Sequence, residues 1–141
     1  MISPALPFFV YGTLRPGEPN HDRFLRGRIR SEEPALLGDA VLYEGPGYPY
    51  AVEERGAGPV HGELVTALPE AYVQLLYELD ELEEYVPGDA HSLYERVERE
   101  AVREDGGTVR AWVYVAAPRV AARLRAHGRP VTGGDWRGRG R

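Results

Sequence analysis

The sequence predicts an α+β domain in which several short strands form a small curled sheet or barrel. The chain alternates short β-rich runs with glycine and proline breaks, and it has one long segment with helical periodicity. Strands do not alternate with helices as they do in a parallel α/β sheet. A length of 141 residues suits a single domain with a real core. About six short strands can be buried together most simply if the sheet curls or closes.

The first half of the chain predicts four extended segments and one short helical turn. Gly45-Pro46-Gly47 and residues 56–59 break the extended segments, and a glycine at position 38 predicts a bulge or bend. Asn20 is a candidate cap for the helical turn, which is expected to end near Gly27. The expected strands are residues 8–10, 35–43, 48–52 and 60–66, and the helical turn is residues 20–25.

The segment that begins at Pro69 has the periodicity of an amphipathic helix. Apolar side chains recur at helical spacing at Leu68, Tyr72, Leu75, Leu76 and Leu79. Proline is tolerated at the first position of such a helix. Residues 86–89 are expected to end it, and a continuous helix would place Glu83 on the apolar stripe.

The second half predicts a β-hairpin followed by a short basic helix. Residues 94–102 and 108–116 read as strands, and residues 104–107 form the turn between them. The second strand is apolar on both faces, so we expect a central strand covered on both sides. The helix is expected at residues 119–126. One domain, residues 1–136, is expected, followed by a basic, disordered tail at residues 137–141.

Composition excludes several classes of function. The chain has no cysteine, which rules out disulfides, thiolate metal sites and a cysteine nucleophile. The four histidines are scattered without metal-ligand spacing, so we expect no metal site. A formal net charge of -5 argues against a nucleic-acid partner. No long apolar run or leader is present, so no membrane association and a cytoplasmic location are expected. No pattern indicates an oligomeric state.

Two features are candidates for a binding or catalytic site. The first is the loop after residues 8–10, where Tyr-Gly-Thr and Arg-Pro-Gly could direct backbone N–H groups at an anion, although any strand-to-helix connection can look similar. The second is Glu83, because burial on an apolar stripe raises the pKa of a carboxyl group and suits it to proton transfer. The alternative is that the helix ends near Asp80 and Glu83 lies in a solvated acidic turn.

Five short motifs occur in a specific order along nearly the whole chain. They are YGTLRPG at residues 11–17, NH at 20–21, LDELE at 79–83, YER at 94–96 and GDWR at 134–137. Together they resemble the γ-glutamylcyclotransferase family, in its short AIG2-like branch. The sequence departs from the family at Glu84, where a glycine usually follows the catalytic glutamate.

The resemblance implies a small mixed, mostly antiparallel β-barrel with flanking helices. It also implies an enzyme in which the α-amine of a γ-glutamyl group attacks its own γ-carbonyl, giving 5-oxoproline and a free amine. No metal or organic cofactor is implied, and the partner is a small-molecule γ-glutamyl amine or amide. One alternative is a tailoring enzyme that removes a γ-glutamyl group from a biosynthetic intermediate. Another is a catalytically silent relative that binds small acids or a protein partner.

The resemblance also assigns roles to residues. Glu83 is the implied general acid and base. The implied binding loop, which would hold the substrate α-carboxylate through backbone N–H groups, consists of Tyr11, Gly12, Thr13 and Leu14. From the residues themselves, the Tyr11 phenol either reaches the substrate or anchors the loop. Tyr94 and Arg96 lie on one side of a strand and either line the pocket mouth or orient Glu83, or form an ordinary cross-strand pair.

Overall fold

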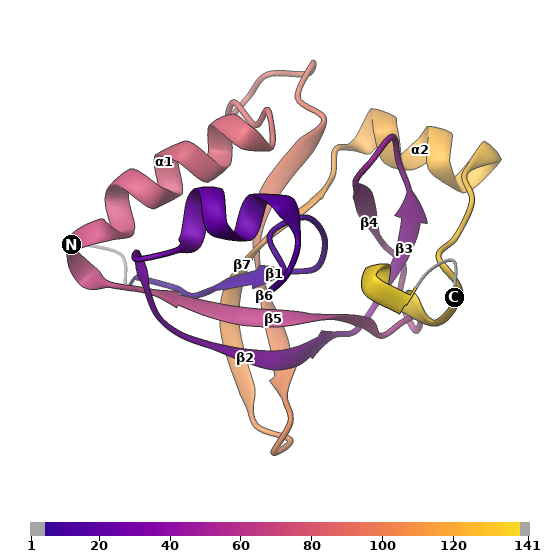
Figure 1. The fold of residues 1–141 in the computed structure, drawn as a ribbon. Helices are drawn as coiled ribbons and strands as arrows, with labels where there is room; N and C mark the ends of the chain where they lie inside the picture. The colour runs from indigo at the N-terminus through magenta and orange to yellow at the C-terminus, as the bar shows by residue number, and fades with distance from the viewer. Residues whose placement is uncertain (1–4, 139–141) are drawn as a thin grey trace.

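A closed five-stranded barrel forms the centre of the protein in a computed structural model that describes residues 5–138. A separate two-stranded sheet and two longer helices lie around the barrel (Figure 1). The barrel order is β1 (Phe8–Val10), β5 (Val60–Ala67), β2 (Ile29–Leu37), β6 (Tyr94–Arg103) and β7 (Thr108–Ala116), and the second sheet pairs β3 (Ala40–Glu44) with β4 (Pro49–Glu53). The predicted α+β class with a small mixed barrel is confirmed.

Most neighbouring strands of the barrel are antiparallel, as predicted. The exception closes the barrel, where β1 runs parallel to β7 and Phe8 lies opposite Trp112. The predicted hairpin is β6 and β7, which pair from Tyr94–Ala116 to Val102–Thr108. Because β7 pairs with both β6 and β1, it is an internal strand.

The two faces of β7 pack into two different core clusters. Tyr114 packs with Phe8 and Val10 in one cluster, and Val113 and Val115 belong to the other. The prediction of a central strand with two covered faces is therefore confirmed. The first cluster also includes Leu75 and Leu79 of the long helix, so the core links that helix to the barrel.

The prediction of one strand over residues 35–43 is wrong. A turn at Gly38 and Asp39 separates β2 from β3, and Asp39 has a left-handed backbone with φ 55°. The Asp39 carbonyl accepts a hydrogen bond from the Glu54 N–H at 2.9 Å, and its carboxylate accepts one from the Gly56 N–H at 2.8 Å. This turn takes the chain out of the barrel and into the second sheet. β2 also begins earlier than expected. Its first half is mostly exposed and polar, and such a segment does not carry the apolar pattern by which a strand is predicted.

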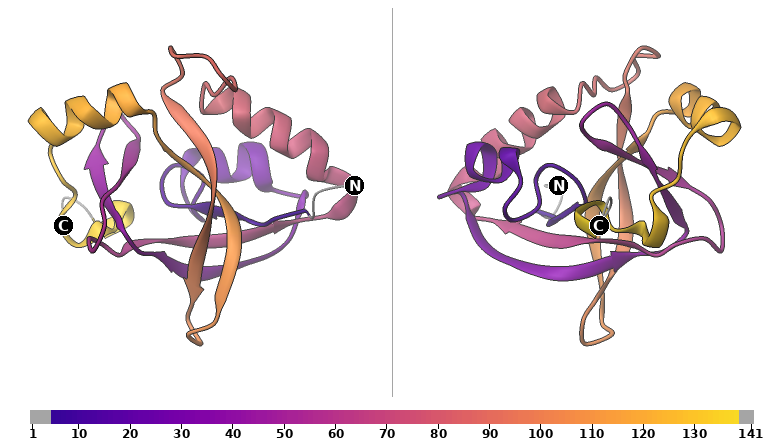
Figure 2. Two further views of the ribbon diagram at one scale, coloured as in Figure 1. Left: turned by 180° about the vertical axis from the view of Figure 1, so that it is seen from behind. Right: turned by 45° about the vertical axis from the view of Figure 1, so that its right-hand side comes forward.

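Two helical segments lie side by side along one end of the barrel (Figures 1 and 2). They are η1 (His21–Leu25) and α1 (Tyr72–Leu82), and the 3₁₀ turn η2 (Pro69–Ala71) leads into α1. The predicted end of the long helix at residues 86–89 is wrong, since α1 ends at Leu82. The fully buried side chains of Leu75 and Leu79 hold the helix against the barrel.

The C-terminal part returns to the barrel. Helix α2 (Pro118–His127) is followed by the short turns η3 (Thr132–Gly134) and η4 (Trp136–Gly138). Trp136 is only 1% exposed and packs in the second core cluster. Of the predicted tail, residues 137 and 138 belong to η4, and residues 139–141 lie outside the described part. No helix within residues 5–138 is long and apolar enough to cross a membrane.

Candidate active site

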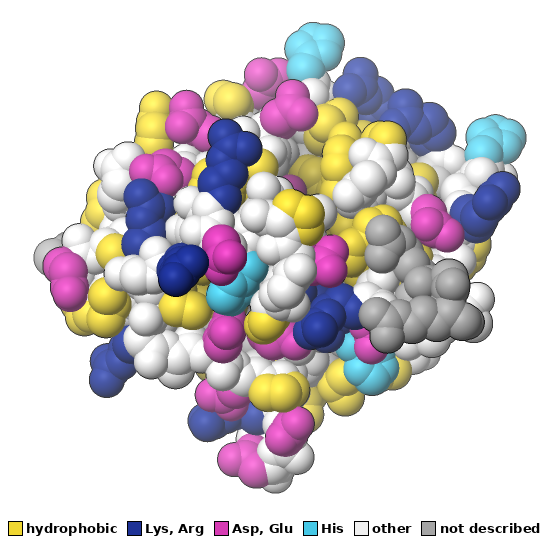
Figure 3. Space-filling view, in the orientation of Figure 1, with side chains coloured by type: hydrophobic (Ala, Val, Ile, Leu, Met, Phe, Trp, Pro, Cys, Tyr) yellow, Lys and Arg dark blue, Asp and Glu magenta, His cyan; other side chains and the backbone are white. Residues whose placement is uncertain are grey.

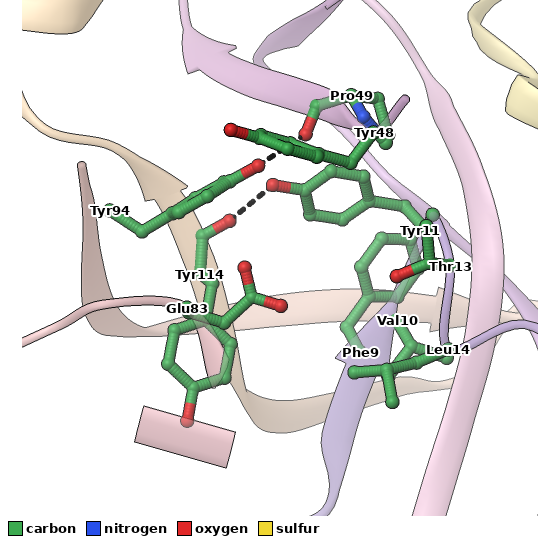
Figure 4. A pocket seen from close by; sticks show the side chains of 11 residues that line it. Phe9, Val10, Tyr11, Thr13, Leu14, Tyr48, Pro49, Glu83, Tyr94 and Tyr114 are labelled. Atoms are coloured by element: carbon green, nitrogen blue, oxygen red, sulfur yellow. Dashed lines mark hydrogen bonds between the residues drawn. The ribbon is translucent and has the colours of Figure 1, made fainter. Parts of the chain in front are cut away.

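A small pocket lies where the loop after β1 meets the C-terminal end of α1. Its empty volume is about 370 Å³, part of which is open to solvent. In the space-filling view, a hollow with hydrophobic side chains opens between the end of α1 and the β3–β4 sheet (Figure 3). The pocket, called the inner pocket below, is lined by Phe9, Val10, Tyr11, Gly12, Thr13, Leu14, Tyr48, Pro49, Glu83, Tyr94 and Tyr114 (Figure 4).

Residues 11–14, called the first loop below, form one wall of the inner pocket. The loop turns tightly, since the Arg15 N–H donates to the Gly12 carbonyl at 3.1 Å. Within residues 5–138, no group accepts a hydrogen bond from the backbone N–H of Gly12, Thr13 or Leu14. Adjacent N–H groups without an acceptor are the donors that an anionic ligand requires.

Close packing explains two residues of the first loop. A Cβ atom added to Gly12 would lie 2.7 Å from Cδ of Pro49, so only glycine fits at this position. Thr13 is held by Asn20, whose N–H donates to the Thr13 carbonyl at 3.0 Å and whose side-chain amide donates to the Thr13 hydroxyl at 2.9 Å. Asn20 was predicted as a helix cap, but its side chain makes no cap hydrogen bond and supports the loop instead.

The phenol of Tyr11 is engaged by the backbone of two strands. Its hydroxyl donates to the Tyr114 carbonyl at 2.5 Å and accepts from the Ala51 N–H at 3.2 Å. Burial and the nearby Glu83 raise the pKa of Tyr11 well above its usual range. Of the two roles considered for this phenol, the geometry corresponds to the anchor of the first loop.

Glu83 is the C-cap residue of α1, and its carboxylate points into the inner pocket (Figure 4). The helix ends in a Schellman motif, because the Tyr85 N–H donates to the Asp80 carbonyl and the Glu84 N–H donates to the Glu81 carbonyl. This motif turns the chain sharply and directs Glu83 toward the first loop. Glu83 therefore does lie in a turn after the helix, as in the alternative, but its carboxylate faces the pocket and is largely desolvated.

The environment of Glu83 is unusual for a carboxylate. No group within residues 5–138 hydrogen-bonds its side chain. Desolvation, together with the negative charge of the neighbouring Glu84, raises the pKa of Glu83 to about 7. A carboxyl group with this pKa can both accept and donate a proton near neutral pH.

Arg96 does not line the inner pocket but contacts the helix that positions Glu83. Its guanidinium donates to the Asp80 carboxylate at 2.9 and 3.3 Å, and it lies 4.4 Å from the ring centroid of Trp112. Asp80 also accepts a hydrogen bond from the Tyr114 hydroxyl at 2.6 Å. These contacts attach the last turn of α1 to both strands of the hairpin. Arg96 thus contacts the helix turn that precedes Glu83, and a role in orienting Glu83 stays a prediction.

Tyr94 does line the inner pocket, and its hydroxyl donates to the Pro49 carbonyl at 2.7 Å. Its ring stacks on Tyr50 at a centroid distance of 4.8 Å. Tyr48, Pro49 and Tyr114 also line the inner pocket, and the sequence assigns no individual role to any of them. The Tyr-Pro-Tyr run after a glycine-rich break was the available signal for the first two. The residues around Tyr114 in the sequence do not indicate that its side chain lines the pocket.

A buried ion-pair network lies directly behind the first loop. Arg15, only 6% exposed, donates to the Glu63 carboxylate at 2.8 and 3.1 Å and to the Asp135 carboxylate at 2.6 Å. The network therefore connects the first loop to β5 and to the C-terminal turns. These bonds fix Arg15, the residue that directly follows the loop.

Together, these residues suit one kind of chemistry. The first loop offers hydrogen-bond donors for an anion, and a carboxyl group of raised pKa faces it across a small pocket with aromatic and apolar walls. A small acidic molecule held by the loop would present its other groups to Glu83 for proton transfer. Within residues 5–138, no three acidic or histidine side chains form a cluster suited to a metal ion.

Residues 8–138 match the model of a protein family. The matching family is described as γ-glutamyl cyclotransferase, AIG2-like. All of the residues that line the inner pocket lie within the matched region.

Individual relatives agree with this match. The chain is 41% identical over 108 residues to the γ-L-glutamyl-butirosin B γ-glutamyl cyclotransferase of Niallia circulans, covering 76% of this chain but only 64% of that protein. It is 30% identical over 123 residues to a putative γ-glutamylcyclotransferase of Drosophila melanogaster, covering 79% and 69% of the two chains. An AIG2-like protein from Mus musculus has a similar crystal structure, with a TM-score of 0.61, 26% identity, and coverage of 79% and 77%.

Proposed function

Because the chain belongs to the AIG2-like γ-glutamyl cyclotransferase family, we propose that it converts a γ-glutamyl amine or amide into 5-oxoproline and a free amine. The observation that supports this most directly is the position of Glu83. Its carboxylate, of raised pKa, faces the free N–H groups of the first loop across one small pocket. The two partners that the reaction needs, an anion-binding loop and a proton-transfer group, are thus within reach of one small substrate.

The reaction begins with binding of the substrate α-carboxylate by the N–H groups of Gly12, Thr13 and Leu14. Glu83 then removes a proton from the α-ammonium group, and the free amine attacks the γ-carbonyl carbon. A new C–N bond closes the five-membered ring while the bond to the leaving nitrogen breaks. Protonated Glu83 gives this proton to the leaving nitrogen. The Glu83 carboxylate then takes the second surplus proton from the ring nitrogen and passes it to the released amine, which leaves as an ammonium ion, so atoms and charges balance without water.

Much of the rate acceleration would come from holding the substrate in a folded conformation. The attack is intramolecular, and correct orientation of reacting groups accounts for a large part of such barriers. The aromatic rings of Tyr48 and Tyr94 narrow the inner pocket and limit the conformations of a bound glutamyl group. The anchored phenol of Tyr11 keeps the first loop at a fixed position relative to Glu83.

A second candidate function is a tailoring reaction in a biosynthetic pathway, with the same chemistry and a larger leaving amine. It is favoured by the 41% identity to a protein named for γ-glutamyl-butirosin B. In this case the enzyme would remove a γ-glutamyl protecting group from an intermediate and release its amine.

The decisive variant is Glu83→Gln, with Glu81→Gln as its matched control on an exposed position of the same helix end. Substrate turnover is measured as 5-oxoproline release from a panel of γ-glutamyl amines, and substrate affinity is measured by calorimetry. We expect Glu83→Gln to reduce kcat by roughly 10²- to 10⁴-fold, the range for a lost general acid–base group, with affinity retained. Unchanged turnover would contradict the assignment of Glu83. Binding without 5-oxoproline release by the wild type would instead identify a catalytically silent relative.

A further inference from the structure

A second, wider hollow adjoins the inner pocket and shares four of its lining residues. The shared residues are Thr13, Tyr48, Glu83 and Tyr94. The empty volume of this hollow, called the outer chamber below, is about 740 Å³, including space open to solvent. Its remaining walls are Pro19, Asn20, Gly47, Leu82, Glu84 and Leu93. The two spaces therefore meet at Glu83.

The two adjoining spaces suggest where each half of the substrate lies, and this inference rests on the proposed function. The glutamyl group occupies the inner pocket, where the N–H groups of the first loop bind its carboxylate. Glu83 must reach both the attacking amine and the leaving nitrogen, so the bond that breaks lies beside it. The leaving amine then extends into the outer chamber, because this is the space that continues from Glu83.

The outer chamber contains negative charge and no lining cation. Glu83 and Glu84 are its charged lining residues, and no arginine, lysine or histidine is among the others. The charge of Glu84 acts within the site, since it contributes to the raised pKa values of both Glu83 and Tyr50. Arg123 of α2 also influences Tyr50 but does not line the chamber.

Glu84 is not required by the backbone at this position. Its φ of 52° is left-handed, a conformation that glycine adopts without strain and other side chains rarely adopt. A glycine would satisfy the Schellman motif at least as well. The effect of the glutamate is therefore chemical, because it places a second carboxylate at the wall of the outer chamber.

We propose that the outer chamber selects γ-glutamyl substrates whose leaving amine has a second, positively charged amino group, and that Glu84 is the residue responsible for this selection. An ammonium group in the chamber is attracted to Glu84. A carboxylate, such as that of a γ-glutamyl amino acid, would be repelled by Glu84 and would find no cation on the chamber wall. The apolar side chains of Leu82 and Leu93 accommodate the methylene groups of a diamine.

Three substrates of matched length test this proposal. They are the γ-glutamyl amides of 1,4-diaminobutane, pentylamine and 4-aminobutyrate, which end in an ammonium, a methyl and a carboxylate group. Their kcat/KM values are compared for the wild type, Glu84→Gln and the control Glu81→Gln at low and high salt. Glu84→Gln also changes the pKa of Glu83, but this change affects all three substrates equally, so the ratios between substrates report on selection alone.

For the wild type we expect the diamine to exceed the aminobutyrate by about tenfold or more at low salt, with a smaller ratio at high salt. In Glu84→Gln the ratio should fall to within a few fold, and in Glu81→Gln it should stay as in the wild type. Equal kcat/KM for the three substrates, or an unchanged ratio in Glu84→Gln, would overturn this inference and leave the proposed function intact. Absence of 5-oxoproline from all three would overturn the proposed function and this inference with it.

Discussion

At the scale of single residues, the central feature is the Glu83 carboxylate, whose environment disfavours the ionised form. Two causes act on Glu83, desolvation first and the charge of Glu84 second. Both raise its pKa well above the usual value for a glutamate, to about 7. The sequence indicated the first cause, because a continuous helix would place Glu83 on the apolar stripe, although in the structure α1 ends at Leu82 and Glu83 is its C-cap residue. It did not indicate that the helix would end there in a Schellman motif, since Glu84 is not a residue that marks a left-handed turn.

The raised pKa predicts the pH dependence of turnover. Glu83 must be ionised to accept the first proton, so kcat/KM should rise with pH and level off above about 7. Removing the neighbouring charge by Glu84→Gln lowers the pKa of Glu83, so the rise should move to lower pH. A pH–rate profile of both proteins with a neutral leaving amine measures this shift. A rise at the same pH in both proteins would show that Glu84 does not influence the titrating group.

At the scale of the elements, the last turn of α1 is the part that determines where Glu83 lies. Asp80 is bonded to Arg96 of β6 and to Tyr114 of β7, and its carbonyl accepts the Tyr85 N–H of the Schellman motif. The sequence predicted α1 and the hairpin as separate elements. The connection between them depends on side chains distant in the chain, and no local pattern contains that information.

Asp80→Asn should therefore impair catalysis through the position of Glu83. We expect the unfolding free energy to fall by roughly 2 kcal/mol, because charge-assisted hydrogen bonds are broken. We also expect kcat/KM to fall about tenfold, because a small displacement of Glu83 from the substrate slows the reaction. The pH–rate profile should also change as Glu83 moves. The matched control is Glu78→Gln on the same helix, which breaks the half-buried pair with Arg28 at 2.8 Å. If both variants lose stability alike and keep the wild-type pH profile, Asp80 has only a structural role.

At the scale of the whole molecule, the barrel brings the two ends of the chain to one place. Arg15 is bonded both to Glu63 in β5 and to Asp135 in the C-terminal turns, and Trp136 beside it is buried. The sequence predicted the barrel and its hairpin well, because alternating and two-sided apolar strands are local signals. It missed the turn at Asp39, where an aspartate adopts the backbone usually occupied by glycine. It also missed this ion-pair network, which joins residues from three distant segments.

Asp135→Asn tests whether the C-terminal turns support the first loop. Burial acts to raise the pKa of the Asp135 carboxyl, but the hydrogen bond and charge of Arg15 hold this pKa below its usual range. This stabilisation is thus present above about pH 4 and is lost as the pH falls through the lowered pKa. We expect the variant to lose about 1–2 kcal/mol of stability at pH 7 and to show a raised KM. Chemical denaturation at pH 7 and pH 3, with Glu33→Gln of an exposed ion pair as the control, measures the effect. Equal stability of variant and wild type at pH 7 would contradict it.

The parallel pair between β1 and β7 also has a consequence for the folding of the protein. Phe8 and Trp112 lie far apart in the sequence, and they must meet before the barrel is closed. Contacts of such long sequence separation have a high loop-closure entropy and are slow to form. The first loop directly follows this three-residue strand. Catalytic activity therefore depends on a contact between residues far apart in the sequence. The recovery of activity during refolding then measures the closure of the barrel.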